Sequence, residues 1–157
     1  MILDKRLIHY NFSKRGGTAI RYLVIHDTGN VSSTATALNH YRYFAGGDRQ
    51  ASAHYFVDQE GVVQIIEDAQ SAWHCGDGRG RYGITNSNSI GIEFCVNRGN
   101  DEKRTLEHLR ELVRELMKFY GIPRERVVRH YDASRKICPG SMRENNWAKW
   151  WGFWESL

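Results

Sequence analysis

Two histidines and one cysteine have the residue types and settings that a bound metal ion requires. His26 and His130 each follow a short apolar run, and Cys138 lies in the loop that follows His130. The end of a strand can aim an imidazole, and Pro139 limits the freedom of the cysteine loop. Two imidazoles and one thiolate leave a tetrahedral Zn²⁺ with one open position, which is the arrangement of catalytic zinc sites.

The spacing of these residues alone leaves other interpretations open. Two core histidines and a buried cysteine would give the same pattern without any metal. A closed structural zinc site is less favoured, because the sequence has no CxxC pair to supply further thiolates. We expect the isolated histidines His9, His40 and His108 to be surface or packing residues.

Strands and helices must position these candidate residues. Hydrophobic patterns typical of strands and of helices are interspersed along the chain. Three helices are predicted: one from a Ser32-Ser33-Thr34 cap to about Phe44, one over 101–120 and one over 143–155. A glycine-rich loop is predicted over 76–88. Without strict βαβ alternation, this order favours an α/β fold with a central mixed β-sheet flanked by helices. Apolar runs predict the strands, at 21–27, 53–58, 62–66, 71–74, 89–96 and 127–130.

The composition indicates one globular domain over residues 1–157. The chain is 41% hydrophobic and 25% charged, and no apolar run approaches the roughly 18 residues of a membrane span, so we expect no membrane insertion. Three cysteines cannot all pair within the chain, so we expect no disulfide framework.

The charge limits the possible partners. A net charge of +4 suits an anionic polymer, but the sequence has no long basic block and no basic-aromatic ladder, so we expect no nucleic-acid partner. The first residues, Met1–Arg6, contain no apolar stretch of signal-peptide length, so we expect synthesis in a bacterial host cytoplasm without a signal peptide.

Five short segments occur in an order that resembles a known enzyme family. Together they resemble the zinc-dependent N-acetylmuramoyl-L-alanine amidases of the phage-lysozyme and peptidoglycan-recognition-protein type, and above all the catalytic domains of endolysins from phages of Gram-positive bacteria. The resemblance covers residues 20 to 142 and implies one Zn²⁺ held by His26, His130 and Cys138. The segments are 24–28 (VIHDT), 53–57 (AHYFV), 72–76 (AWHCG), 89–93 (SIGIE) and 130–139 with its Cys-Pro pair.

Glu93 is the candidate for proton transfer at this site. It interrupts an otherwise apolar strand, where an unpaired carboxylate would be costly. A solvent-facing position on an edge strand is the alternative that alternation allows. The resemblance implies a glutamate beside the zinc, which acts as a general base toward water and then as a proton donor to the leaving amine.

Lys136 matches a lysine that the phage enzymes place over the site. Its cation would stabilise the oxyanion of the reaction, and a solvated surface lysine is the alternative. One position departs from the pattern, because some phage amidases carry a catalytic tyrosine immediately before the histidine of the second segment. Here that position is Ala53, so no tyrosine role is expected.

Four further residues are candidates for binding the substrate. Trp73 and His74 resemble the wall of the family's substrate groove, where the tryptophan offers a face to a sugar or a peptide, and a core tryptophan is the alternative. Arg79 in the glycine-rich loop could meet carboxylates of the peptide stem. For His54, a hydrogen bond to the backbone inside the fold is the alternative to a place in the site.

The last predicted helix carries four tryptophans at a spacing that places them on one helical face. Such a stripe predicts core packing, with sugar stacking or docking of a wall-binding domain as alternatives. The four residues are Trp147, Trp150, Trp151 and Trp154.

The resemblance implies hydrolysis of the amide between the lactyl group of N-acetylmuramic acid and L-alanine in peptidoglycan. A monomeric phage or prophage endolysin or autolysin, released through holin-type pores to act on the cell wall, fits this activity. Three alternatives stay open: a cytoplasmic amidase that recycles anhydro-muropeptides, a non-catalytic module that binds peptidoglycan, and a zinc-stabilised interaction protein.

Overall fold

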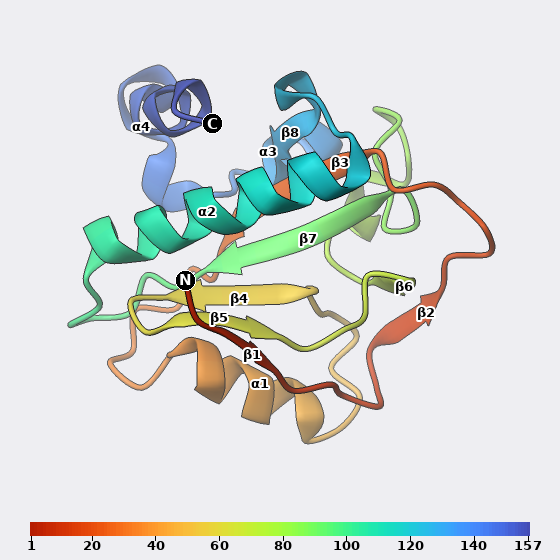
Figure 1. Ribbon diagram of the computed structural model, residues 1–157, viewed down its shortest axis with the longest axis horizontal. Helices are drawn as coiled ribbons and strands as arrows, with labels where there is room; N and C mark the ends of the chain where they lie inside the picture. Colours follow the sequence, from red (N-terminus) through yellow and green to blue (C-terminus); the bar gives the residue numbers. More distant parts are fainter.

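The computed structural model describes residues 1–157 and is built on a six-stranded mixed β-sheet with helices on both faces (Figure 1). The strand order is β1-β5-β4-β7-β3-β8. The pair β4 and β5 is antiparallel, and every other pair of neighbouring strands in this sheet is parallel. The predicted α/β class with a central mixed sheet is therefore confirmed. The strands are β1 (Leu3–Lys5), β3 (Tyr22–Asp27), β4 (Tyr55–Asp58), β5 (Gly61–Gln64), β7 (Ser89–Phe94) and β8 (Val127–Arg129), while β2 (Phe12–Lys14) and β6 (Gln70–Ala72) form a separate antiparallel pair.

Four α-helices and three short 3-10 turns connect these strands. Helix α2 lies across one face of the sheet and α1 covers the other (Figure 1). No helix combines the length and the apolar character that crossing a membrane requires. The helices are α1 (Ala37–Ala45), α2 (Glu102–Tyr120), α3 (His130–Ser134) and α4 (Glu144–Glu155), and the turns are η1 (Gly76–Gly78), η2 (Arg124–Arg126) and η3 (Gly140–Met142).

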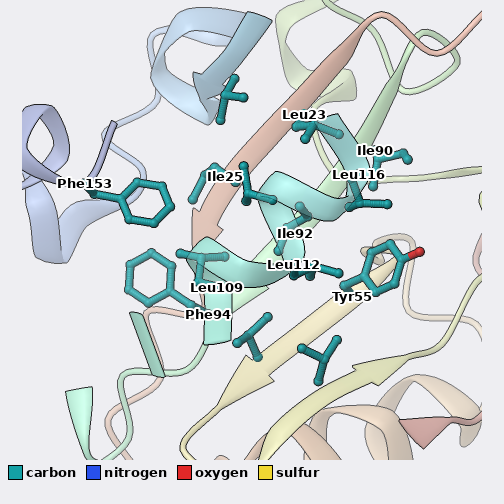
Figure 2. Close-up of a cluster of buried hydrophobic side chains, with 14 of the residues drawn as sticks. Leu23, Ile25, Tyr55, Ile90, Ile92, Phe94, Leu109, Leu112, Leu116 and Phe153 are labelled. Carbon is teal, nitrogen blue, oxygen red and sulfur yellow. The ribbon is translucent and has the colours of Figure 1, made fainter. Parts of the chain in front are cut away.

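The main hydrophobic core lies between α2 and the sheet, as Figure 2 shows. The apolar stripe of α2 that the sequence predicts, with Leu109, Leu112 and Leu116, packs on side chains from β3 and β7. Asp101 caps this helix by accepting a hydrogen bond from the backbone N–H of Arg104 at 3.0 Å.

The alternation of β3 and β7 separates the core from a polar face. Leu23 and Ile25 of β3 join the α2 core, so Val24 and His26 point to the opposite side, where Val24 packs in a separate cluster with Cys75, Ile84 and Ala133. In β7, the apolar Ile90, Ile92 and Phe94 likewise join the α2 core, which leaves Ser89, Gly91 and Glu93 on the same face as His26.

Several predicted boundaries need correction. Helix α1 begins at Ala37, capped by the Thr36 hydroxyl, rather than after Ser32–Thr34. Strand β6 ends at Ala72, so His74 lies in the following turn rather than in a strand. His130 is the first residue of α3, directly after β8, and not the last residue of a strand. Three-residue strands such as β1 and β2 are too short to show a periodic pattern.

The core packing that the tryptophan stripe predicts is confirmed for Trp150, Trp147 and Trp154, which belong to the main core or pack against it, and is wrong for Trp151. Trp150 is buried with Phe153, but Trp151 is 43% exposed. The backbone of Asn145, Asn146 and Trp147 is left-handed, with φ between 50° and 65°, so Trp147 is out of helical register with the later tryptophans. The spacing rule holds only for a continuous right-handed helix.

Replacing Gly91 by alanine should destabilise the fold. A Cβ at this position would lie 2.7 Å from Cδ2 and 2.8 Å from Nδ1 of His74, so the ring must move. We expect Gly91→Ala to lower the free energy of unfolding by about 1–3 kcal/mol, measured by urea denaturation. Gly152→Ala is the control, because a Cβ there meets nothing within 4 Å and alanine favours the helix. Equal stability of the two variants would contradict this close contact.

Candidate metal centre

His26, His130 and Cys138 come together in the structure. Their ligand atoms all lie within 4.8 Å of one another, and all three side chains are buried. The thiol Sγ of Cys138 lies 3.7 Å from Nδ1 of His26. His26, more than a hundred positions before the other two residues, therefore joins them in one compact donor set of two nitrogens and one sulfur.

The sheet and two backbone anchors position these donors. His26 is the last but one residue of β3, and His130 follows β8, the parallel neighbour of β3. The Cys138 carbonyl accepts a hydrogen bond from the N–H of Tyr131 at 3.0 Å, which ties the cysteine loop to the start of α3. Asp27 accepts a hydrogen bond from the N–H of Ser141 at 2.7 Å, which ties the same loop to the end of β3.

Each histidine of the set has an outer partner at its Nε2 atom. His26 Nε2 lies 3.1 Å from Nδ1 of His74, and His130 Nε2 lies 2.8 Å from Oδ1 of Asp77. In both rings this leaves Nδ1 for a metal. Asp77 reaches His130 because η1 packs directly against the backbone of α3, where only a glycine fits at position 78.

Burial keeps the imidazoles in the neutral form that binds metals. It holds the pKa of His26 well below its usual value, with the charges of His130 and Lys136 acting in the same direction. The pKa of His130 is also lowered by burial, although its hydrogen bond to Asp77 opposes this. Burial and the Glu93 carboxylate raise the pKa of the Cys138 thiol, so a bound cation is needed to favour the thiolate.

Glu93 lies beside the donor set. It is the register partner of His26 on the neighbouring strand, and its Oε1 lies 4.0 Å from His26 Nδ1. Its Oε2 is buried without a hydrogen-bond partner. Desolvation, followed by the charge of Asp27, raises the pKa of Glu93 to about 8, with Lys136 opposing this. A carboxyl group with an open oxygen and a raised pKa can both accept and return a proton near neutral pH.

A cleft of about 330 Å³ opens beside the donor set. Lys136 lines this cleft and is exposed, and Trp73 and His74 form part of its wall. The indole Nε1 of Trp73 donates a hydrogen bond to Ser13 Oγ at 2.8 Å, which fixes the orientation of its ring. The full lining consists of Gln50, Trp73, His74, Gly76, Asp77, Asn86, His130 and Lys136.

Two predicted substrate residues do not line this cleft. His54 is fully buried; its Nδ1 accepts a hydrogen bond from the N–H of Gly91 at 3.0 Å, and its Nε2 faces Arg15 and the carbonyl of Gln70. His54 therefore has the position inside the fold, with hydrogen bonds to the backbone, that the sequence analysis gave as the alternative to a place in the site. Arg79 is exposed in the turn after η1 and is absent from the lining of the cleft.

Sequence reasoning missed the residues that hold the ligands from outside. Asp77 contacts His130, Asp27 anchors the cysteine loop through Ser141, and Ser89 contacts His74, the outer partner of His26. For Asp77, the only sign in the sequence was that a carboxylate lies in the glycine-rich loop. Its contact with His130 depends on the packing of η1 on α3, which no local pattern reveals.

Comparison with known proteins decides the family. The model of the N-acetylmuramoyl-L-alanine amidase family matches residues 16–141, which is most of the chain. The chain belongs to the N-acetylmuramoyl-L-alanine amidase family. The matched region contains all three donors, Glu93 and Lys136.

Individual relatives agree with this family. The chain is 32% identical over 145 residues to the N-acetylmuramoyl-L-alanine amidase CwlH of Bacillus subtilis, covering 91% of this chain and 57% of CwlH. The solved catalytic domain of XlyA, an amidase of Bacillus subtilis, has a TM-score of 0.88 at 29% identity, with 99% of each chain covered. A mutant endolysin from Bacillus subtilis has a TM-score of 0.86 at 30% identity, covering 99% of this chain and 98% of the endolysin. The chain spans only 36% to 57% of the length of the first curated relatives it matches.

The metal-free protein should lose stability in acid as its buried histidines resist protonation. Burial lowers the pKa of His54 to about 3, whereas an unfolded histidine titrates near 6.5. Between these values the unfolded chain binds a proton that the native chain does not, so stability falls as the pH drops below about 6.5. We expect His54 alone to cost about 2–3 kcal/mol at pH 4.5 relative to pH 7, measured by urea denaturation in a chelator.

The matched comparison is His54→Gln, which removes this titration and should flatten the pH dependence of stability. His9→Gln, at an exposed position, should leave the pH dependence as in the wild type. A wild-type curve parallel to that of His54→Gln between pH 7 and 4.5 would contradict the prediction.

Proposed function

We propose that this chain is a zinc-dependent amidase that cleaves the amide between the lactyl group of N-acetylmuramic acid and L-alanine in peptidoglycan. The observation that carries the proposal is the convergence of His26, His130 and Cys138 beside Glu93, within a chain of this family. The match of 99% of this chain to 99% of the solved catalytic domain of XlyA supports a single catalytic domain over residues 1–157.

The donor set suits zinc. Two neutral imidazoles and a cysteine sulfur are ligands that Zn²⁺ prefers, and three protein ligands leave a fourth position open for chemistry. A closed structural site would need a fourth ligand, and the set contains three. When bound here, zinc would supply Lewis-acid polarisation of the substrate carbonyl and of the attacking water.

Glu93 and Lys136 would carry the proton and charge changes of the reaction. Glu93 takes one proton from water as the water oxygen bonds to the amide carbon, and returns it to the nitrogen as the carbon–nitrogen bond breaks. The products are the lactyl carboxylate and the free amino group of L-alanine. The exposed Lys136 cation in the cleft would stabilise the negative oxygen that develops between these two steps.

The cleft supports a role for Trp73 and His74 in holding the substrate beside the donor set, with the Trp73 ring as a face for a sugar or peptide. Arg79 remains a candidate only for more distant parts of the peptide stem. We further infer that the protein acts as a monomer on a bacterial cell wall, after release from the producing cell through a holin-type pore. The positive net charge would favour its binding to anionic wall polymers.

Digestion of purified cell walls, followed by mass spectrometry of the products, tests the bond. We expect glycan strands that end in lactyl carboxylates and peptide stems with a new amino-terminal L-alanine. Chelation should remove this activity and added zinc should restore it. Cleavage at glycosidic or cross-bridge bonds, wall binding without any release of L-alanine amino groups, or full activity without metal would each contradict the proposal.

Substitutions should separate the metal ligand from the proton-transfer group. Cys138→Ser should lose zinc affinity and activity together, because it removes one of three direct ligands. Glu93→Gln, which is nearly isosteric, should retain most of the zinc affinity and lower kcat by about 10²–10⁴-fold. Zinc affinity is measured by competition with a chelator, and kcat on soluble muropeptides. Loss of zinc binding in Glu93→Gln would show that Glu93 acts as a ligand instead.

A further inference from the structure

We propose that His74 and Ser89 hold the ring of His26 in the tautomer that presents Nδ1 to the metal. This inference rests on the zinc site proposed above. It makes His74 a positioning residue as well as part of the cleft wall. It follows from counting the protons along a chain of hydrogen bonds that starts at a backbone carbonyl and ends at the metal ligand.

The chain of hydrogen bonds begins at the carbonyl oxygen of Thr85, which can only accept. Ser89 Oγ lies 2.5 Å from this oxygen, so the single hydroxyl proton of Ser89 is donated there. The same Oγ lies 3.1 Å from Nε2 of His74. Because the hydroxyl proton is already used, Nε2 of His74 must carry a proton and donate it to Ser89.

The proton on Nε2 of His74 determines what its other nitrogen can do. A neutral imidazole has one ring proton, so Nδ1 of His74 is left as an acceptor. It lies 3.1 Å from Nε2 of His26, which must therefore be the protonated nitrogen of that ring. Nδ1 of His26 then carries a free lone pair, and it is this atom that lies 3.7 Å from Sγ of Cys138.

The ring of His74 is held firmly enough to enforce this arrangement. It lies against Gly91 of β7, where the Cβ of any other residue would collide with the ring. The side-chain oxygen of Asn86 accepts hydrogen bonds from the backbone N–H groups of His74 and Cys75, at 3.0 and 2.8 Å, which fixes the turn that carries the ring. Ser89 itself is completely buried, so water does not compete for its hydroxyl.

A pair of substitutions at His74 tests the role of its Nδ1 atom. His74→Asn keeps an acceptor oxygen near the position of Nδ1, whereas His74→Leu has a similar shape without any acceptor. We expect His74→Leu to weaken zinc binding by about 10–100-fold, the usual effect of losing an outer partner of a ligand histidine. His74→Asn should retain most of the affinity, and Ser89→Ala should weaken it by a smaller factor than His74→Leu. Affinity is measured by competition with a chelator, independently of activity.

The tautomer itself can be observed by nitrogen NMR of the histidine rings. In the zinc-loaded wild type, His26 should show a protonated Nε2 and a metal-bound Nδ1, and His74 a protonated Nε2. A protonated Nδ1 on His74 would overturn the inference, because Nε2 of His26 would then have to be the acceptor.

The outcomes separate this inference from the proposed function. If the wild type binds no zinc, the proposed function fails first. If the wild type binds zinc and His74→Leu binds it equally well, only the inference is overturned. If His74→Asn and His74→Leu lose affinity equally, the ring acts through packing and the acceptor role is wrong. Thermal unfolding of the metal-free variants identifies any variant that has lost the fold. If the His74 variants do not fold, Ser89→Ala is the deciding variant, and an unchanged zinc affinity of Ser89→Ala would contradict the inference.

Discussion

The parallel pairing of β3 with β7 and β8 is the constraint on which the site depends. This register places His26 opposite Glu93 and brings the end of β8, where His130 follows, to the same edge of the sheet. Slipping either strand by one residue would turn its side chains to the other face. The apolar residues of β3 and β7 prevent such a slip, because it would move Ile25 and Ile92 out of the core beneath α2.

The same alternation allows a polar site to exist inside a small domain. One face of the central strands is packed with aliphatic side chains, and its burial supplies the main stabilisation of the fold. The opposite face carries histidines, whose burial is tolerable only where their ring nitrogens have partners. His54 accepts a hydrogen bond from the N–H of Gly91 and donates one to the carbonyl of Gln70, and the ring nitrogens of His74 face Ser89 and His26, so both rings meet that condition.

The sequence predicted the parts of this arrangement that depend on local pattern. The apolar runs before His26 and His130 located two of the strands, and the periodic stripe of Leu109 and its neighbours located α2. Contacts between separate loops could not be predicted in this way. The position of Asp77 depends on how η1 packs against α3, and the left-handed backbone of Asn145, Asn146 and Trp147 interrupts the helical periodicity before Trp150. Periodicity describes an element but not its neighbours.

Glu93 departs from the rule that buried polar atoms find partners. Buried side-chain atoms without a hydrogen bond are few in this structure, namely Thr28 Oγ1, Glu93 Oε2 and Asn97 Oδ1. Only the Glu93 atom belongs to an ionisable group, and the other oxygen of the same carboxyl group, Oε1, lies 4.0 Å from Nδ1 of His26. A carboxylate satisfied by several hydrogen bonds would have a low pKa and would be a weak base. The open oxygen of Glu93 therefore has a cost in stability that is consistent with a group required to exchange a proton.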